Sequence, residues 1–491
     1  MPKVKTSKAS LIRQWLQEFP HYTSDGKIIL CQVCNKEVSS EKKCHLTQHA
    51  QGALHKSNVE RKYKMKQTLL TQTSETSSKK NEFSADLCHA IIAANIPFKT
   101  LENTHFRNFL EKYCHQKIPS ESTLRKYYVQ PAYEDIISRI RDNLKDSYLW
   151  FSVDETTDSL GRYVANLIVG KLDADGPSRA YLIYTKQLTK TNHETVAHFV
   201  NNGLKIINPD EDKVLVAVTD AASYMVPAMK TLKIFFPALV HVTCLAHGLN
   251  RVAEQIRVEY EKVNKLISSV KKVFIKAPSR VQAFRQMLPD VALPPEPVLT
   301  RWGTWLKAVN YYSEHFSDIK KLLDTLADDA VCVTKAKEIL NDIYVQNDLV
   351  YIKSHFTFIA DTITALESSG KPIYEQIDLL NRAKQKLCDA PGTAAEKVRK
   401  KLDAVLQKNT GLKSLFVVAD ILAGKKSKTE SEFPVHLLPR LKYCPLSSVD
   451  VERSFSAYKL ILSDKRCNFS IENLEKVLII YCEANYGKQS E

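Results

Sequence analysis

The chain has 491 residues, 44% of them hydrophobic and 25% charged, so we expect two to four domains with a sizeable buried core. Its net charge is +15, and the first 70 residues hold 13 Lys and Arg against 5 Asp and Glu. This basic end favours a nucleic-acid partner. The alternative is a basic, solvated tail. The apolar runs are only strand-length, which argues against a membrane protein. No signal peptide is visible and the eleven cysteines form no regular framework, which argues against a secreted protein. Paired cysteines are then expected to bind a metal rather than to form disulfides.

The first predicted element is a ββα-type zinc finger. Its cysteines are separated by two residues and its histidines by five: Cys31, Cys34, His49 and His55. A hairpin can bring two thiolates together, and a helix can present two imidazoles, which makes a tetrahedral set of four N and S ligands typical of structural zinc. A turn at Asp25-Gly26 is predicted between the two short strands. Cys44 and His45 are competing ligands, but their spacing fits less well.

The predicted zinc helix runs into a basic segment that can neutralise phosphates: Lys56, Arg61 and Lys62. The finger and this segment resemble the BED-type and CGG-repeat-binding-protein-type fingers, which occur at the front of transposases and of proteins derived from them. The resemblance implies that residues 1–67 form a zinc-finger domain that binds double-stranded DNA.

Residues 68–82 are rich in Ser and Thr and lack an apolar pattern, which predicts a linker. Residues 83–145 show helical periodicity and are predicted as a small module of four helices: 83–95, 103–113, 120–128 and 132–144. The apolar stripes of these helices are most simply core. A role of the module in DNA binding or dimerisation would rest on family analogy alone.

Residues 146–255 change from helical to strand periodicity. The predicted order is strand, strand, strand, helix, strand, helix, strand and helix: 148–153, 163–171, 180–185, 193–207, 213–219, 222–235, 239–243 and a helix from 245. This is the order of an RNase H-like fold, in which the first and fourth strands are neighbours. Asp154 and Asp220, which end these two strands, would then lie together.

Residues 256–435 are dominated by helical periodicity and are predicted as an all-helical insertion. Residues 436–491 return to the core. Ser447 and Asp450 have the spacing of a capping box, which would begin a helix that carries Glu452, and a second helix is predicted over 470–485. The expected fold class is therefore a multi-domain α+β protein: a zinc finger, a helical module and an RNase H-like core interrupted by the insertion.

The three acidic residues Asp154, Asp220 and Glu452 form the candidate catalytic site. A carboxylate where a buried strand meets solvent is fixed in position yet open to a hydrated cation, and two such Asp with a distant Glu on a helix are typical of two-metal nucleic-acid enzymes. An Asp at a strand end is more often a turn or helix cap, and Glu155 or Asp158 could take the place of Asp154.

Five segments in this order resemble a hAT superfamily transposase over nearly the whole chain: Phe151–Asp158, Val218–Met225, Cys244–His247, Thr300–Trp302 and Cys444–Ser456. The resemblance implies that Asp154, Asp220 and Glu452 hold two Mg²⁺ or Mn²⁺ ions as a DDE-type site. It also implies that the last 50 or so residues contain a dimerisation region. One position departs from the family pattern, since Ala221 stands where Asn is common.

The resemblance further implies roles for four residues outside the triad. His247 would approach the scissile phosphate with Cys244 supporting it, Arg301 would contact phosphate, and Trp302 would stack on a base flipped out as DNA forms a hairpin. The alternatives are that Cys244 and His247 are core residues and that Trp302 packs the insertion, with Trp305 as its rival.

The function implied by the resemblance is cut-and-paste transposition by two-metal phosphoryl transfer. The protein would act in the nucleus as a homodimer or larger homo-oligomer, on the terminal inverted repeats of its element and on target DNA. An alternative is a domesticated nuclear transcriptional regulator that binds DNA without cutting it. A nuclease of the RNase H type without transposition would leave the helical insertion unexplained.

Overall fold

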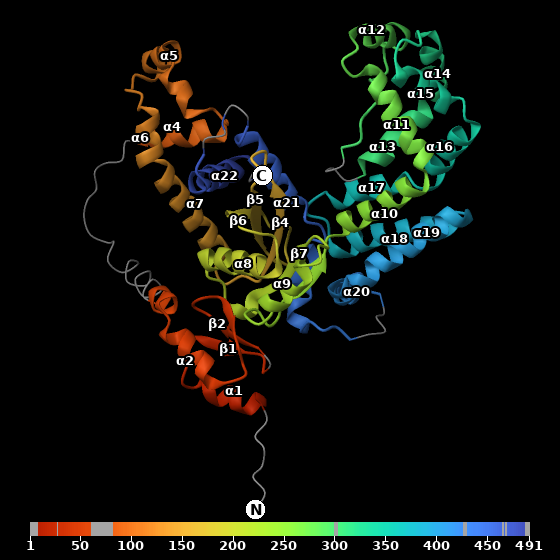
Figure 1. The fold of residues 1–491 in the computed structure, drawn as a ribbon. Coiled ribbons are helices and arrows are strands. Elements are labelled where there is room, and N and C mark those ends of the chain that lie inside the picture. Colours follow the sequence, from red (N-terminus) through yellow and green to blue (C-terminus); the bar gives the residue numbers. More distant parts are fainter. Residues whose placement is uncertain are drawn as a thin grey trace, which may run out of the picture.

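The computed structural model describes residues 8–26, 28–59, 82–298, 303–425, 430–463, 466 and 469–486. In these ranges the chain is a mixed α+β protein with a three-stranded sheet near the N-terminus, a five-stranded sheet further along and many helices (Figure 1). The predicted α+β class is confirmed. The predicted linker 68–82 lies outside the described residues, apart from Glu82. None of the described helices is long and apolar enough to cross a membrane.

The N-terminal unit contains one helix and one strand more than the predicted ββα finger. It consists of α1 (Lys8–Leu16), β1 (Tyr22–Ser24), β2 (Ile29–Cys31), β3 (Lys36–Val38) and α2 (Lys43–Gln51), and residues 53–59 are also helical. The strands pair antiparallel in the order β1-β2-β3. The predicted turn lies between β1 and β2, where Gly26 has a φ of +91° and Asp25 Oδ1 accepts from the Ile28 N–H at 2.8 Å. A small hydrophobic cluster around Leu46 forms a core separate from that of the remaining chain.

The helical module contains the four predicted helices: α4 (Glu82–Ala93), α5 (Thr104–Cys114), α6 (Glu121–Tyr127) and α7 (Val129–Leu144), with a 3₁₀ turn η1 (Phe98–Glu102) between the first two. Side-chain caps fix two of their starts, because Asn103 accepts from the first turn of α5 and Ser120 from that of α6. The apolar faces of α4 and α7 join the hydrophobic cluster of the large sheet, as expected for core stripes.

The large sheet is formed by β4 (Leu149–Thr157), β5 (Tyr163–Lys171), β6 (Ala180–Leu188), β7 (Val214–Thr219) and β8 (Val240–Thr243), in the order β6-β5-β4-β7-β8. β4 is antiparallel to β5 and parallel to β7, and β8 is parallel to β7. The connecting helices are α8 (His193–Ile207) and α9 (Met225–Leu232), with a 3₁₀ turn η2 (Glu211–Lys213). All five predicted strands are present, and β4 and β7 are neighbours as expected.

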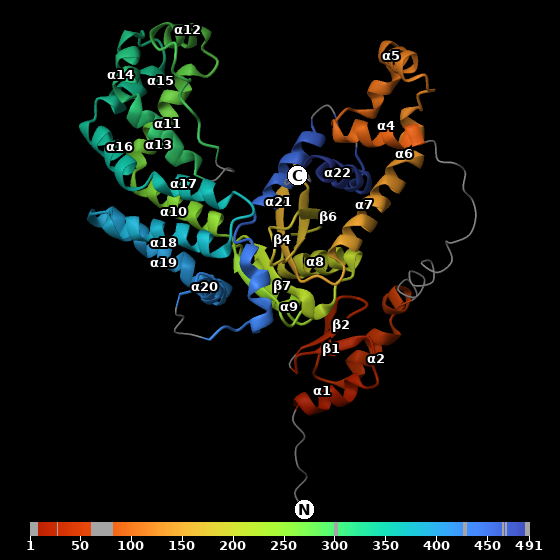
Figure 2. The same ribbon diagram turned by 180° about the vertical axis from the view of Figure 1, so that it is seen from behind.

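Helices cover both faces of this sheet, which explains why its strands are nearly continuous apolar runs. Gly203 of α8 lies against Leu167 and Tyr184 on one face. Asn166 and Thr185, the next residues along the two strands, contact two C-terminal helices on the other face. These are α21 (Val449–Ile461) and α22 (Ile471–Tyr486), so segments some 290 residues apart in sequence pack together (Figure 2).

The segment between β8 and these helices is helical, as predicted, and extends to one side of the sheet (Figure 1). Its helices are α10 (Leu245–Glu259), α11 (Glu261–Phe274), α12 (Pro278–Met287), α13 (Thr304–Glu314), α14 (Phe316–Thr325), α15 (Val331–Leu340), α16 (Ile343–His355), α17 (Phe358–Leu366), α18 (Ile373–Asp389), α19 (Gly392–Lys408) and α20 (Thr410–Leu422). Two 3₁₀ turns, η3 (Val435–Leu437) and η4 (Pro439–Tyr443), lead back towards α21.

The predicted capping box at the start of α21 is wrong. The N-cap residue is Ser448, and it makes no side-chain cap hydrogen bond. Ser447 instead donates to the Leu366 carbonyl at the end of α17 (3.0 Å), while Asp450 accepts from Arg453 (2.9 Å). The segment before α21 is held by the helical insertion rather than by a local cap, because Ser447 stands one position too early to reach the first turn.

Candidate metal centres

The Cys and His motif near the N-terminus closes into a four-ligand cluster. Cys31 ends β2, Cys34 lies in the turn to β3 and His49 lies in α2, while His55 belongs to the helical stretch after Gly52. One ligand atom of each residue lies within 4.8 Å of those of the other three. The two histidines thus come from two helical segments rather than the single predicted helix. This arrangement could bind zinc.

The polar atoms of this cluster fit a metal ion. His49 Nε2 is buried and has no hydrogen-bond partner, which is the state expected of a ligand atom whose partner is a cation. Burial lowers the pKa of both histidines, so their imidazoles are neutral and able to coordinate at neutral pH. Burial raises the pKa of Cys31, although hydrogen bonds from backbone N–H groups of Cys34 and Val33 oppose the rise.

The competing ligands lie outside this cluster, and Cys44 is exposed. Of the basic residues that follow the finger, Lys56 is exposed in the helical stretch after α2. Arg61 and Lys62 lie outside the described residues.

Asp154 and Asp220 are brought together by the register of the sheet. The parallel pairing of β4 with β7 ends at Val153 opposite Thr219, so the two aspartates are the next residue on each strand. β4 itself continues to Thr157 along β5. Asp154 therefore lies inside a strand rather than at its end, and the predicted strand 148–153 was too short.

Glu452 joins the two aspartates from the first turn of α21. Burial raises the pKa of Asp154 well above its usual value, and the nearby carboxylates of Glu452 and Asp220 raise it further. Burial also raises the pKa of Glu452, against a hydrogen bond with Asp154 that lowers it. The three carboxyl groups thus lie close together, with Asp154 buried and Asp220 and Glu452 partly buried. Among the described residues, the oxygen atoms of the three carboxylates do not lie as close together as the ligand atoms of the Cys and His cluster. A pair of ions about 4 Å apart would need carboxylates that are spaced more widely than the ligands of a single ion.

Two alternative acids have other partners in the structure. Asp158 accepts from the Arg162 guanidinium at 2.7 Å and from the Tyr458 hydroxyl at 3.0 Å. Burial would raise the pKa of Asp158, but these hydrogen bonds outweigh it and lower the pKa. Glu155 accepts from the Tyr224 hydroxyl, and burial with the nearby Asp220 raises its pKa to about 7. Asp158 therefore anchors the loop after β4, whereas Glu155 stays beside the triad.

His247 lies in the first turn of α10, close enough to Asp220 for this carboxylate to oppose the lowering of its pKa by burial. Cys244 is 2% exposed, and its Sγ accepts from the N–H groups of His247 (3.4 Å) and Ser448 (3.3 Å). Because Cys244 is buried, it can only support its neighbours and cannot itself contact DNA. It caps α10 and ties that helix to the segment that begins α21.

The predicted DNA-contacting residues Arg301 and Trp302 lie outside the described residues. Gly303, the next residue, donates its N–H to Asn250 Oδ1 on α10 at 3.1 Å. Trp305, the rival of Trp302, is 3% exposed and donates to Asn264 at 3.2 Å. Trp305 is therefore a core residue of the insertion.

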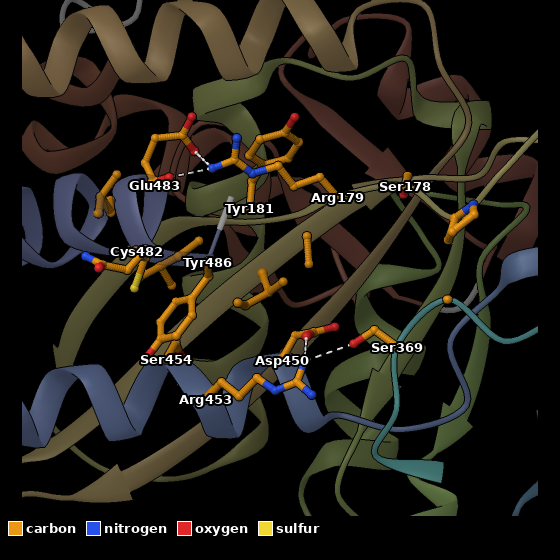
Figure 3. Close-up of a pocket in the computed structure, with 17 residues that line it drawn as sticks. Ser178, Arg179, Tyr181, Ser369, Asp450, Arg453, Ser454, Cys482, Glu483 and Tyr486 are labelled. Atoms are coloured by element: carbon orange, nitrogen blue, oxygen red, sulfur yellow. Dashed lines mark hydrogen bonds and ion pairs between the residues drawn. The ribbon is translucent and has the colours of Figure 1, made fainter. Parts of the chain in front are cut away.

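A cavity of about 610 Å³ lies on the other side of α21, between β5, β6 and α22 (Figure 3). Its charged residues are paired with one another, Arg179 with Glu483 at 2.5 Å and Arg453 with Asp450 at 2.9 Å. Asp450 lines this cavity, while Glu452 belongs to the neighbourhood of Asp154. The distinction between these two acids on the first turn of α21 agrees with the choice of Glu452 as the candidate ligand.

Sequence reasoning missed the buried polar residues that support the triad. Asn166 stands directly opposite Asp154 in the pairing of β4 with β5 and is fully buried. A single Asn inside the apolar run of β5 was the one available signal, because a buried amide requires partners. The identity of those partners could not be obtained from the sequence.

Two family models match parts of the chain. A model of the CGGBP1 helical domain matches residues 74–131, and a model of a domain of unknown function, DUF659, matches residues 119–273. The first covers most of the helical module, and the second covers the large sheet with α8 to α11. No curated protein matches the chain. Because DUF659 is typical of hAT-like transposases, the two matches support a hAT-related protein.

Proposed function

We propose that the protein is a hAT-type transposase whose sheet is an RNase H-like core. The observation that carries this proposal is the convergence of Asp154, Asp220 and Glu452. Two of them follow the last paired residues of neighbouring parallel strands, and the third arrives from a helix more than 230 residues later. The strand order β6-β5-β4-β7-β8 and the match to DUF659 support the same interpretation.

The triad would hold two Mg²⁺ or Mn²⁺ ions. Carboxylate oxygens are the ligands that such cations prefer, and the carboxylates of Glu452 and Asp220, which raise the pKa of the buried Asp154, favour a positive charge beside it. When bound, the ions would activate the attacking water or 3′-hydroxyl and stabilise the leaving oxygen.

His247 is the candidate for contact with the scissile phosphate. Burial lowers its pKa, so the imidazole is neutral at neutral pH and able to donate one hydrogen bond. Asn250, one turn further along α10, holds the backbone of Gly303. Arg301 and Trp302, which lie outside the described residues, would contact phosphate and a flipped base.

DNA is the proposed partner of both metal centres. The finger with Lys56, Arg61 and Lys62 would bind the terminal inverted repeats, and the triad would act on the element ends and on target DNA. The proposed location is the nucleus. The proposed assembly is a homodimer or larger homo-oligomer through the helical module and the C-terminal region.

Cleavage of a defined substrate tests this proposal. With Mg²⁺ or Mn²⁺, the purified protein should nick or cut DNA that carries the element's terminal repeats, and Asp154→Asn should abolish cutting because it removes a charged metal ligand. Gel analysis of labelled DNA measures both. The matched control is Asp175→Asn, which alters an exposed carboxyl in the turn between β5 and β6 and should cut like the unaltered protein. Equal cutting by Asp154→Asn would refute the assigned site.

A second candidate is a domesticated DNA-binding regulator that keeps the fold without cutting. The match of residues 74–131 to the CGGBP1 helical domain supports it, beside the basic finger. Specific binding of the repeats with no metal-dependent cutting would favour this candidate over the first.

A further inference from the structure

A row of buried polar side chains crosses the sheet beside the candidate metal site. Asp154 on β4 pairs with Asn166 on β5, and Asn166 pairs with Thr185 on β6. Side chains directly opposite each other in antiparallel strands lie on the same face. The three residues therefore form one line across the face that α21 and α22 cover. Asn166 and Thr185 are at most 1% exposed.

These side chains form a continuous hydrogen-bonded chain between the two C-terminal helices. Glu475 of α22 accepts from the Thr185 N–H at 3.3 Å, and the Thr185 hydroxyl donates to Asn166 Oδ1 at 2.9 Å. The Asn166 amide then donates to Ser454 Oγ at 2.8 Å. Finally, the Ser454 hydroxyl donates to the Val451 carbonyl at 2.6 Å. Asn166 and Ser454 are each acceptor and donor in the same direction, so the bonds from Thr185 to Val451 reinforce one another, whereas Thr185 donates at both ends, through its backbone to Glu475 and through its hydroxyl to Asn166.

This series of hydrogen bonds ends at two residues of α21 that flank the candidate ligand Glu452. Val451 precedes Glu452, and Ser454 follows it by two positions on α21. Because Asn166 is opposite Asp154 on the strand pair, its bond to Ser454 connects the helix that carries Glu452 to the residue beside Asp154. The bond between one amide and one hydroxyl thus helps to set the distance between Asp154 and Glu452, which come from segments far apart in the chain.

Packing alone constrains α21 weakly on one side, since the cavity of about 610 Å³ lies against Asp450, Arg453 and Ser454 (Figure 3). Interiors normally hold a helix by close packing. Where a cavity replaces that packing, directional bonds must supply the restraint. Tyr458, one turn after Ser454, adds a second such bond by donating to Asp158 at 3.0 Å.

We propose that Asn166 and Ser454 are positioning residues for the candidate two-metal site: their buried hydrogen bond sets α21 so that Glu452 faces Asp154. The inference rests on the proposed function, because it takes the triad as metal ligands. Removal of the Ser454 hydroxyl leaves the Asn166 amide without its partner and frees the first turn of α21 to rotate towards the cavity.

Manganese binding tests the inference without DNA. The full-length, zinc-loaded protein is titrated with Mn²⁺, and free Mn²⁺ is followed by electron paramagnetic resonance. Binding that Asp154→Asn abolishes defines the site. Ser454→Ala should weaken this binding about 10–100-fold, the usual effect of losing a residue that orients a metal ligand, while its circular dichroism spectrum stays unchanged. Its DNA cutting should recover at high Mn²⁺ concentration, which a misfolded protein would not show.

Two control variants separate positioning from general damage. Ser454→Thr keeps the hydroxyl and adds a methyl group beside the cavity, so it should bind Mn²⁺ like the unaltered protein. Leu460→Ala shortens an exposed side chain on the same helix and should also have no effect. Equal Mn²⁺ affinity of Ser454→Ala would overturn the positioning role while leaving the metal site intact. No Asp154-dependent Mn²⁺ binding by the unaltered protein would overturn the proposed function and this inference together.

Discussion

Burial, as much as charge, determines the chemistry of the residues around the triad. Asp154 lies among carboxylates in a site with little solvent, where its own ionisation is costly. The same principle explains the Cys and His cluster, whose buried His49 nitrogen has no hydrogen-bond partner. The four-ligand set with this nitrogen could bind zinc, and the acidic triad is proposed to hold Mg²⁺ or Mn²⁺.

His241 on β8 shows the same effect of burial away from the metal ligands. Its Nε2 lies 2.8 Å from the Thr219 hydroxyl, and that hydroxyl already donates to the Asp220 carbonyl. His241 Nε2 therefore carries the proton and donates. Burial lowers the pKa of His241 to about 4, so the folded protein keeps this imidazole neutral over a range in which the unfolded chain protonates it.

We predict that His241 makes the core less stable in acid. The pKa of His241 in the folded protein, about 4, lies below its value of about 6.5 in the unfolded chain. The free energy of unfolding is therefore unaffected by this group above pH 6.5. It decreases as the pH falls towards 4, by up to about 3 kcal/mol. His241→Gln, whose side chain does not titrate, should therefore gain stability relative to the unaltered protein as the pH falls from 7.5 to 4.5 in thermal melting. His193→Gln, an exposed position at the start of α8, is the control. A constant difference for His241→Gln across this range would contradict the prediction.

At the scale of elements, the insertion is attached to the sheet at the end of β8. Asn409, just before α20, accepts from the Thr243 N–H at 3.0 Å and donates to the Thr243 carbonyl at 2.7 Å. Gly411 then approaches the backbone of β8 so closely that an added Cβ would lie 2.1 Å from the His241 carbonyl oxygen. Since β8 leads directly into Cys244 and α10, this contact helps to place His247.

Gly411→Ala should consequently destabilise the protein, although alanine normally favours a helix. The obstructing atom belongs to the backbone and cannot move aside as a side chain can, so α20 must shift away from β8 at a cost of about 1–3 kcal/mol. Thermal melting should show a lower midpoint, and DNA cutting should fall with it. Gly176→Ala, in a turn where no atom lies within 4 Å of the added Cβ, should melt like the unaltered protein. A midpoint that is unchanged or higher for Gly411→Ala would show that this close approach does not constrain α20.

Elements proved easier to predict than the contacts between them. The strands of the large sheet are buried on both faces, so their apolar runs stand out, and the parallel β4 and β7 bring Asp154 and Asp220 together. β4 extends beyond its apolar run because β5 continues to pair with it. The capping box failed because Ser447 bonds to Leu366, 81 residues away in the chain. The Asn166–Ser454 bond spans 288 residues, and no local pattern specifies such a partner.

At the scale of the whole molecule, the Cys and His cluster and the acidic triad belong to separately packed parts. The finger surrounds its own small cluster, which contains Leu46 and Ile29, while the helical module, sheet, insertion and C-terminal helices share one continuous core. A direct side-chain contact links the two parts, since Asn35 donates to Asn202 of α8 at 3.3 Å. Loss of structure in the finger should therefore have little effect on the core.

Zinc removal tests this independence. A structural zinc supplies much of the folding free energy of a small finger, and apart from the ligand Cys31 only five buried residues form the small cluster: Ile12, Tyr22, Ile29, Val38 and Leu46. We expect Cys31→Ser to lose one zinc per chain by elemental analysis and to bind the terminal repeats at least tenfold more weakly, while the main thermal transition of the core is unchanged. Cys44→Ser, which alters an exposed cysteine outside the cluster, should retain both the zinc and the affinity. Undiminished DNA binding by Cys31→Ser would remove the finger from the DNA interface, and a shifted main transition would show that finger and core fold as one unit.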